Sequence, residues 1–251
     1  MGDRRISFLV KLFERPEYAD QFMAGGLYLN RLSFFKRIEN AADLVRGDPY
    51  EGTFAWLQPR GLRISMNPPG MGPIEITDQH LTRPVSISMV DHDDLHALCT
   101  YAVHSPTFDV RDDGRVELTP ELVAELVAHR TFDDRCREFG QHAVVMHAKP
   151  FLDRLASALD ERRLGATGRL VEYYDDETFN GEFALQDAPF RKHKRFEWQR
   201  EFRVCVRTDT HGDDPLRFEM GDISDIAFRT CADHLNEVFK LDVDALRDQA
   251  A

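Results

Sequence analysis

The chain has 251 residues, of which 42% are hydrophobic and 18 are phenylalanine, and it carries a formal net charge of −12. This length and apolar content exclude global disorder, and the acidic balance argues against a general polyanion-binding surface, because cationic contacts to phosphates dominate nucleic-acid affinity. No apolar run is long enough for a transmembrane helix or a cleavable signal, and four scattered cysteines without a CxxC pair predict reduced thiols in a cytoplasmic protein.

In the first part of the chain, alternating apolar residues and turn signals predict short strands and helices. Pro16 favours a helix start and the pair Gly25-Gly26 a helix end, so we expect a helix between them. The polar stretch 40–53 is expected to be a loop. The other expected elements are strands at 6–13, 27–30, 62–65, 74–77 and 84–90 and helices at 32–38 and 95–103.

In the second part, Asp112-Asp113-Gly114 is typical of a hairpin turn, and Thr119-Pro120 is typical of a helix start. Strands are expected at 143–147, 170–174, 204–206, 216–218 and 226–228, helices at 151–159 and 232–239, and a surface loop at 175–187. Because the strands do not alternate regularly with helices, we predict a single α+β domain over residues 1–251, with short mixed or antiparallel strands and several peripheral helices.

Residues 191–207, RKHKRFEWQREFRVCVR, are the most informative stretch. Glu201 and Arg203 lie two apart, so they share one face at the start of a strand that we expect in the same sheet region as the first strand. Gln199 and Glu201 share a side in the same way, and a carboxylate there would stabilise an oxocarbenium-like state in glycosyl transfer. The alternative is that Glu201 only pairs with Arg203 or Arg207 on a solvated face.

Other polar groups are candidates for ligand contacts. Ser86 and Ser88 lie on one face of a predicted strand, where hydroxyls fix a bound sugar or amide, or are simply its polar side. Asp48 and Glu51 lie in a glycine-hinged loop and either reach a ligand or cap a turn. The basic run 191–195 contacts phosphates or is a solvated cluster.

Histidines 92 and 96 are four residues apart, a spacing at which two histidines on a helix can share a metal ion. However, His92 precedes the expected helix, and Asp93 and Asp94 have the pattern of its N-terminal caps. We therefore predict no metal site.

Six segments follow the first strand in order: FMAGGLYLNRLSFFK, RGDPYEG, PVSIS, FGQHAVVMHAKPFLDRL, VEYYD and FRKHKRFEWQREFRV. Together they resemble a large bacterial and phage-associated family whose domain has no assigned function. The resemblance covers nearly the whole chain. It implies a single domain and a bacterial or phage source, and it supplies no established activity. We expect the protein to act as a phage or bacterial conflict or defence factor.

Three landmarks also resemble the arginine/serine/glutamate class of ADP-ribosyltransferases: Lys11 on the first strand, the pair Ser86 and Ser88, and Gln199-Arg200-Glu201. The resemblance implies NAD as substrate. Lys11 would hold its phosphates, the serines would line the nicotinamide pocket, and Glu201 would be the catalytic glutamate.

The same resemblance implies roles for residues around these landmarks. Gln199 would orient the acceptor, a protein or a nucleic acid, and Arg191 or Lys194 would help to hold the pyrophosphate. Tyr28 and Phe35 are candidates for stacking on a ring, or are core residues.

Two other functions stay open at the level of sequence. One is a non-enzymatic interaction module of a phage or defence system, which predicts an exposed apolar patch and no deep cleft. The other is a nucleic-acid-binding or nuclease-like domain built on residues 191–195 with Asp48 and Glu51, which needs a metal and a continuous basic groove. The sequence does not indicate the oligomeric state.

Overall fold

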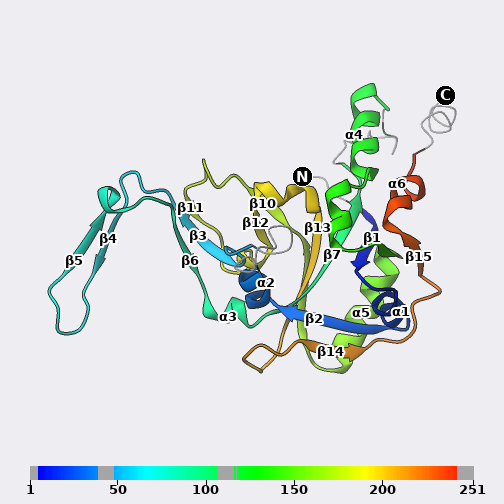
Figure 1. Cartoon of the computed structure of the whole chain (residues 1–251), viewed down its shortest axis with the longest axis horizontal. Coiled ribbons are helices and arrows are strands. Elements are labelled where there is room, and N and C mark those ends of the chain that lie inside the picture. The colour runs from blue at the N-terminus through cyan, green and yellow to red at the C-terminus, as the bar shows by residue number, and fades with distance from the viewer. Residues whose placement is uncertain (1–4, 39–47, 107–115, 117, 242–251) are drawn as a thin grey trace.

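The computed structural model describes residues 5–38, 48–106, 116 and 118–241, and within them the architecture is α+β, as the sequence predicts (Figure 1). Its largest element is an eight-stranded antiparallel sheet. The strands follow the order β14 (Leu216–Glu219), β2 (Gly26–Arg31), β7 (His96–His104), β1 (Ile6–Phe13), β8 (His142–His147) and β15 (Ala227–Cys231), and β13 (Glu201–Arg207) pairs with both β7 and β9 (Gly165–Leu170).

Residues 95–103, expected to be helical, instead form β7 at the middle of this sheet. The prediction was wrong because β7 is buried along nearly its whole length, so its apolar residues do not alternate with polar ones. Periodicity alone does not separate such a strand from a buried helix. Asp93 and Asp94, expected to cap that helix at its N-terminus, instead lie at the end of the short helix α3 (Val90–Asp93).

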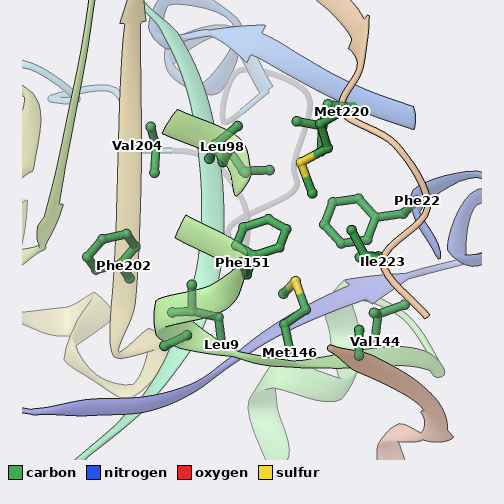
Figure 2. Close-up of a cluster of buried hydrophobic side chains, with 14 of the residues drawn as sticks. Leu9, Phe22, Leu98, Val144, Met146, Phe151, Phe202, Val204, Met220 and Ile223 are labelled. Carbon is green, nitrogen blue, oxygen red and sulfur yellow. The ribbon is translucent and has the colours of Figure 1, made fainter. Parts of the chain in front are cut away.

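Two helices, α1 (Pro16–Met23) and α5 (Ala148–Glu161), pack against one face of the large sheet. The buried residues of α5 recur at helical spacing, which gives the helix one apolar face. Figure 2 shows Phe151 of α5 among Phe22 of α1 and the strand residues Leu98 and Met146. The ring centroids of Phe22 and Phe151 are 6.0 Å apart. This core fixes the positions of β1, β7 and β8.

The opposite face of the sheet carries a smaller apolar cluster that includes Val10, Tyr101 and Val145. Short helical turns, among them η3 (Asp134–Phe139) and η6 (Ala232–His234), supply its outer residues. Part of this face is polar, and Glu201 and Arg203, described below, lie there, opposite Tyr101 and Cys99 in the register.

Three small sheets accompany the large one. β3 (Thr53–Leu57) lies between β11 (Gly181–Glu182) and β6 (Val85–Ser88), and β10 (Glu172–Tyr174) pairs in parallel with β12 (Arg191–His193). β4 (Arg63–Met66) and β5 (Ile74–Thr77) form a hairpin that projects from the rest of the molecule (Figure 1). The remaining elements are α2 (Leu32–Ile38), α4 (Pro120–Arg130), α6 (Leu235–Val238), η2 (Asp78–His80), η4 (Ala188–Phe190) and η5 (Lys194–Gln199).

Several expectations are confirmed. The elements at 6–13, 32–38 and 74–77 have the expected bounds. Thr119 caps α4, since its Oγ accepts a hydrogen bond from the Leu122 N–H at 3.2 Å. The first strand and β13 belong to one sheet because both pair with β7. β3 was not expected, and the Asp112-Asp113-Gly114 hairpin lies outside the described residues.

None of the helices in the described part of the chain combines the length and the apolar character needed to cross a bilayer.

Candidate functional site

Along one edge of β7, the neighbouring strands β1 and β2 leave a gap in the large sheet. Residues 30 and 31 of β2 pair with one end of β7, and residues 6–10 of β1 pair with the other end, while β13 runs along the opposite edge. In this register residues 98–100 of β7 have a strand neighbour on the β13 side and an opening between β1 and β2 on the other. The opening is where a ligand can approach the sheet.

A cavity of about 900 Å³ lies at this opening. Its volume is within the range of small-molecule sites. The walls come from the strands β1, β2, β7, β13 and β14 and from α1, α2 and η3. Their aromatic members are Phe13, Tyr18, Phe22, Tyr28, Phe34, Phe35, Tyr101, Phe139 and Phe218. Polar and charged side chains also line the cavity, and those from η5, β12 and β13 form one group. Lys11 and Arg217 line it from β1 and β14.

The polar group from η5, β12 and β13 is a buried ionic cluster centred on Glu201. Its Oε1 accepts a hydrogen bond from Arg203 Nε at 2.6 Å, and its Oε2 accepts one from Lys192 Nζ at 3.0 Å. Lys192 Nζ also donates to Gln199 Oε1 at 2.7 Å. Glu201 is 5% exposed and Arg203 1% exposed, so both oxygens of a desolvated carboxylate meet cations.

Glu51, from the turn before β3, adds a second carboxylate to the cluster. It forms an ion pair with Arg203, and its Oε2 lies 3.9 Å from Lys192 Nζ. The Tyr173 hydroxyl accepts a hydrogen bond from the backbone N–H of Glu201 at 2.9 Å. Two carboxylates therefore balance two cations, which makes burial of all four groups tolerable.

The two carboxylates differ in acidity. Burial would raise the pKa of Glu201, but Arg203 and Lys192 hold it below its ordinary value. Burial dominates for Glu51 and raises its pKa, although the same two cations oppose the shift. Burial lowers the pKa of Lys192, but Glu201 and Glu51 outweigh it and hold that pKa above its ordinary value. Glu201 is thus the more acidic of the two carboxylates.

Lys11 closes part of the opening in the sheet. Its Nζ donates to the backbone carbonyl of Cys99 at 2.8 Å, on the stretch of β7 that β1 and β2 leave open. The ammonium group thus takes the position that a neighbouring strand's N–H would fill. Because Lys11 also lines the cavity, it brings a positive charge to the lining.

The backbone conformation of Arg200 sets the directions of its two neighbours. Arg200 is left-handed, with φ 40°, at the junction of η5 and β13. Its carbonyl accepts from Ala102 N–H at 2.9 Å, and its Nη1 donates to the Ala128 carbonyl at 2.8 Å. Non-glycine residues in this conformation cost about 1–3 kcal/mol and persist only where their surroundings fix them. Here the turn lets Gln199 and Glu201 both reach Lys192.

The structure brings some of the predicted site residues together. Lys11, Gln199 and Glu201 all line the cavity, and the stacking candidates Tyr28 and Phe35 line it as well. Tyr28 is half exposed, and the guanidinium of Arg217 lies 5.0 Å above its ring.

Other predicted residues lie elsewhere. Ser86 and Ser88 are on β6, which pairs with β3 in a separate sheet, and their exposed side chains do not line the cavity. The observed position of these two serines therefore does not agree with the expected one beside nicotinamide.

The cations at 191 and 194 also lie outside the lining of the cavity. Arg191 pairs with Glu172, and Lys194 is exposed at the start of η5. Sequence reasoning treated residues 191–195 as one run, whereas Lys192 and His193 are buried and their neighbours are not. Lys192 was missed for this reason. The alternation of a strand does not find it, because Lys192 and His193 are consecutive and both buried.

Asp48 and Glu51 are both completely buried. Asp48 Oδ1 accepts a hydrogen bond from the Tyr50 N–H at 3.0 Å, which is the geometry of a capped turn. Glu51 belongs to the ionic cluster, and it does not line the cavity. Of the two roles expected for these residues, a ligand contact or a turn cap, Asp48 has the geometry of the turn cap.

His92 and His96, whose spacing was considered for a metal ion, each contact a different backbone carbonyl. His92 Nδ1 lies 3.4 Å from the Gly52 carbonyl, and His96 Nε2 lies 3.1 Å from the Asp214 carbonyl. Over the residues that the structure describes, no three histidine, cysteine or acidic side chains are arranged to hold a metal ion.

No protein-family model matches the chain, and no curated protein or solved structure matches it either. The two family resemblances therefore stay predictions, and functional inference rests on the cavity and its ionic cluster.

Proposed function

We propose that the cavity binds a small organic ligand with a planar ring and a hydrogen-bonding head group. NAD is the ligand to test first, and transfer of ADP-ribose is the reaction. The observation that supports this proposal most is the position of Glu201, an ionised carboxylate at the wall of a cavity with many aromatic residues. Such sites combine apolar walls with a few polar groups that fix orientation.

In this proposal Glu201 accepts a hydrogen bond from the ribose next to nicotinamide. The bond between ribose C1′ and the nicotinamide nitrogen breaks, and nicotinamide leaves with the electron pair. The positive charge that develops on the ribose is stabilised by the nearby carboxylate. The acceptor then bonds to C1′ and loses its proton. Gln199 orients the acceptor, and Lys11 neutralises phosphate charge.

The cations beside Glu201 limit how strongly it can act. Arg203 and Lys192 keep it ionised, but they also cancel part of its field at the ribose. The carboxylate is therefore better suited to hold and orient a hydroxyl group than to attack as a nucleophile. Slow NAD hydrolysis or transfer is the activity that this arrangement favours.

Two observations favour this function over the nuclease-like alternative. Asp48 and Glu51 are completely buried, and Glu51 is engaged with Arg203 and Lys192. The net charge of −12 also opposes binding of a nucleic-acid substrate.

The test is NAD turnover, followed as nicotinamide release and as transfer of a labelled ADP-ribose group. Glu201→Gln keeps the size of the side chain and removes its charge, so turnover should fall by a factor of roughly 100. Glu172→Gln is the matched control, because Glu172 forms an exposed ion pair with Arg191 and should leave turnover unchanged. Equal turnover in wild type and Glu201→Gln would exclude the role given to Glu201.

A further inference from the structure

The hairpin that projects from the body belongs to an inserted segment, residues 58–84, which we call the arm. The arm leaves from the end of β3 and returns at the start of β6, and these two strands pair with Leu57 opposite Val85. A two-residue turn could join the strands at this point. The β3–β6 pairing therefore does not require the arm, and Figure 1 shows the arm extending far from the large sheet.

The arm has an ordered structure of its own. β4 and β5 pair in antiparallel register from Arg63 opposite Thr77 to Met66 opposite Ile74. At its base Asp78 Oδ2 accepts a hydrogen bond from the Gly61 N–H at 3.2 Å. In the described part of the chain, the main contacts of β4 and β5 are with each other and with η2. Body elements thus contribute little to holding the hairpin.

One face of this hairpin is apolar. The register places Ile64 opposite Ile76 and Met66 opposite Ile74, and alternation along a strand puts all four side chains on the same face. Ile64, Ile74 and Ile76 are half-buried, Met66 is 41% exposed, and Met71 at the tip is 66% exposed. An isolated two-stranded hairpin is marginally stable in water. A regular register with a partly exposed apolar face is hence a structure that a partner can complete.

Charge favours a second copy of this chain as the partner. The arm carries three arginines against two carboxylates, and its tip, residues 67–73, has no charged residue, whereas the whole chain has a net charge of −12. Two such acidic molecules repel each other, and the arm is the part of each that can approach the other without repulsion. A standard interface takes roughly 20–30 residues per side, so the apolar face and tip of the 58–84 arm supply part of it and the body of the other copy the rest.

We propose that the arm is a homodimerisation element. Two arms pack apolar face against apolar face about a two-fold axis, with the tip of each arm against the body of the other copy. The same patch is used on both copies, as closed two-fold symmetry requires. Ile64, Ile76, Met66 and Ile74 form the centre of the contact, and the polar face with Ser65 and Glu75 points to solvent.

The first test is the mass in solution, measured by light scattering after size exclusion over roughly 1–100 µM, a range that resolves micromolar dissociation constants. The wild-type chain should give twice its 29.0 kDa mass. A variant with residues 58–84 replaced by Asn-Gly should be monomeric and keep its circular dichroism spectrum. A monomeric wild type, or a variant without the arm that remains dimeric, overturns the proposal.

Point variants locate the contact within the arm. The double variant Ile64→Thr and Ile76→Thr keeps β-branched residues, so the hairpin should persist, while the dimer dissociation constant should rise about 100-fold or more. The polar-face variant Ser65→Thr with Glu75→Gln is the control and should change it by less than about threefold. An equal effect of both variants contradicts the assigned face.

A lipid surface is the competing occupant for an exposed tip with methionine and proline. Sedimentation with vesicles of phosphatidylcholine and phosphatidylglycerol separates the two cases. The dimer should stay in the supernatant. Binding of the wild-type chain to vesicles that is lost with the arm would overturn the proposal in favour of membrane docking.

Discussion

His193 is a buried histidine whose charge state links pH to stability. It is 1% exposed, and its ring lies 4.8 Å from that of Tyr50 and 4.7 Å from that of Trp56. Burial lowers its pKa to about 4, although Asp176 at 3.7 Å acts in the opposite direction. The unfolded chain, with an ordinary histidine pKa near 6.5, binds this proton more readily than the folded one.

Stability should therefore fall as the pH decreases from about 6.5 to about 4, by up to ~3 kcal/mol from this group. His193→Gln should flatten the dependence in this window, whereas the exposed control His234→Gln should not. Urea denaturation between pH 4.5 and 7 measures the effect. A wild-type stability that is constant over this range would show that His193 accepts its proton in the folded state.

The two buried carboxylates should respond differently to neutralisation. Glu201 is held ionised by Arg203 and Lys192, so Glu201→Gln leaves two buried cations with less compensation and should cost roughly 3–5 kcal/mol at pH 7. Glu51 already has a raised pKa, so Glu51→Gln should cost less. Chemical denaturation of the two variants gives the comparison, and a larger loss for Glu51→Gln would reverse the assignment.

Among elements, the sequence predicted several helices and strands, including the buried strands β8 and β13, but it failed for β7. The apolar face of α5 follows from the helical spacing of its apolar residues, and the start of α4 follows from its N-cap Thr119. β7 does not, because a central strand gains its stability from neighbours distant in sequence.

In the site, too, local sequence patterns predicted some features, whereas features that depend on long-range packing were missed. The sharing of a face by Glu201 and Arg203 follows from alternation along a strand, and their side chains do meet. The burial of Lys192 and the position of Glu51 depend on β12 and the turn before β3 packing against β13, contacts that a sequence pattern does not encode. Ser86 and Ser88 were grouped with the site by resemblance alone, and the topology of β6 takes them elsewhere.

Gly140 is required where η3 meets the end of β1. Its φ is 138°, and a Cβ there would lie 2.1 Å from the backbone carbon of Phe13. Backbone cannot move aside as a side chain can, so Gly140→Ala should cost several kcal/mol. Gly61 has φ 77° with open space around it, and Gly61→Ala should cost only about 1 kcal/mol. Thermal unfolding of the two variants checks this contrast, and similar melting temperatures would contradict it.

At the scale of the molecule, the large sheet combines strands from both ends of the chain, since β8 pairs with β1 on one side and β15 on the other. We predict that limited proteolysis cuts the exposed arm, residues 58–84, before it separates the chain into two halves. The fragments should stay associated after this cut, because β3 and β6 remain paired. Two stable, separable halves of similar size would contradict a single domain.

The central claim is that the cavity between β1 and β2 binds a ligand of the NAD type. Calorimetric titration of NAD into the wild-type protein and into Lys11→Ala and Tyr28→Ala tests it directly, because both residues line the cavity and neither belongs to the buried ionic cluster. We predict saturable binding by the wild type that weakens about tenfold in each variant, the scale of one lost polar or ring contact. Absence of NAD binding by the wild type at roughly millimolar concentration, weaker than about −4 kcal/mol, would contradict the account.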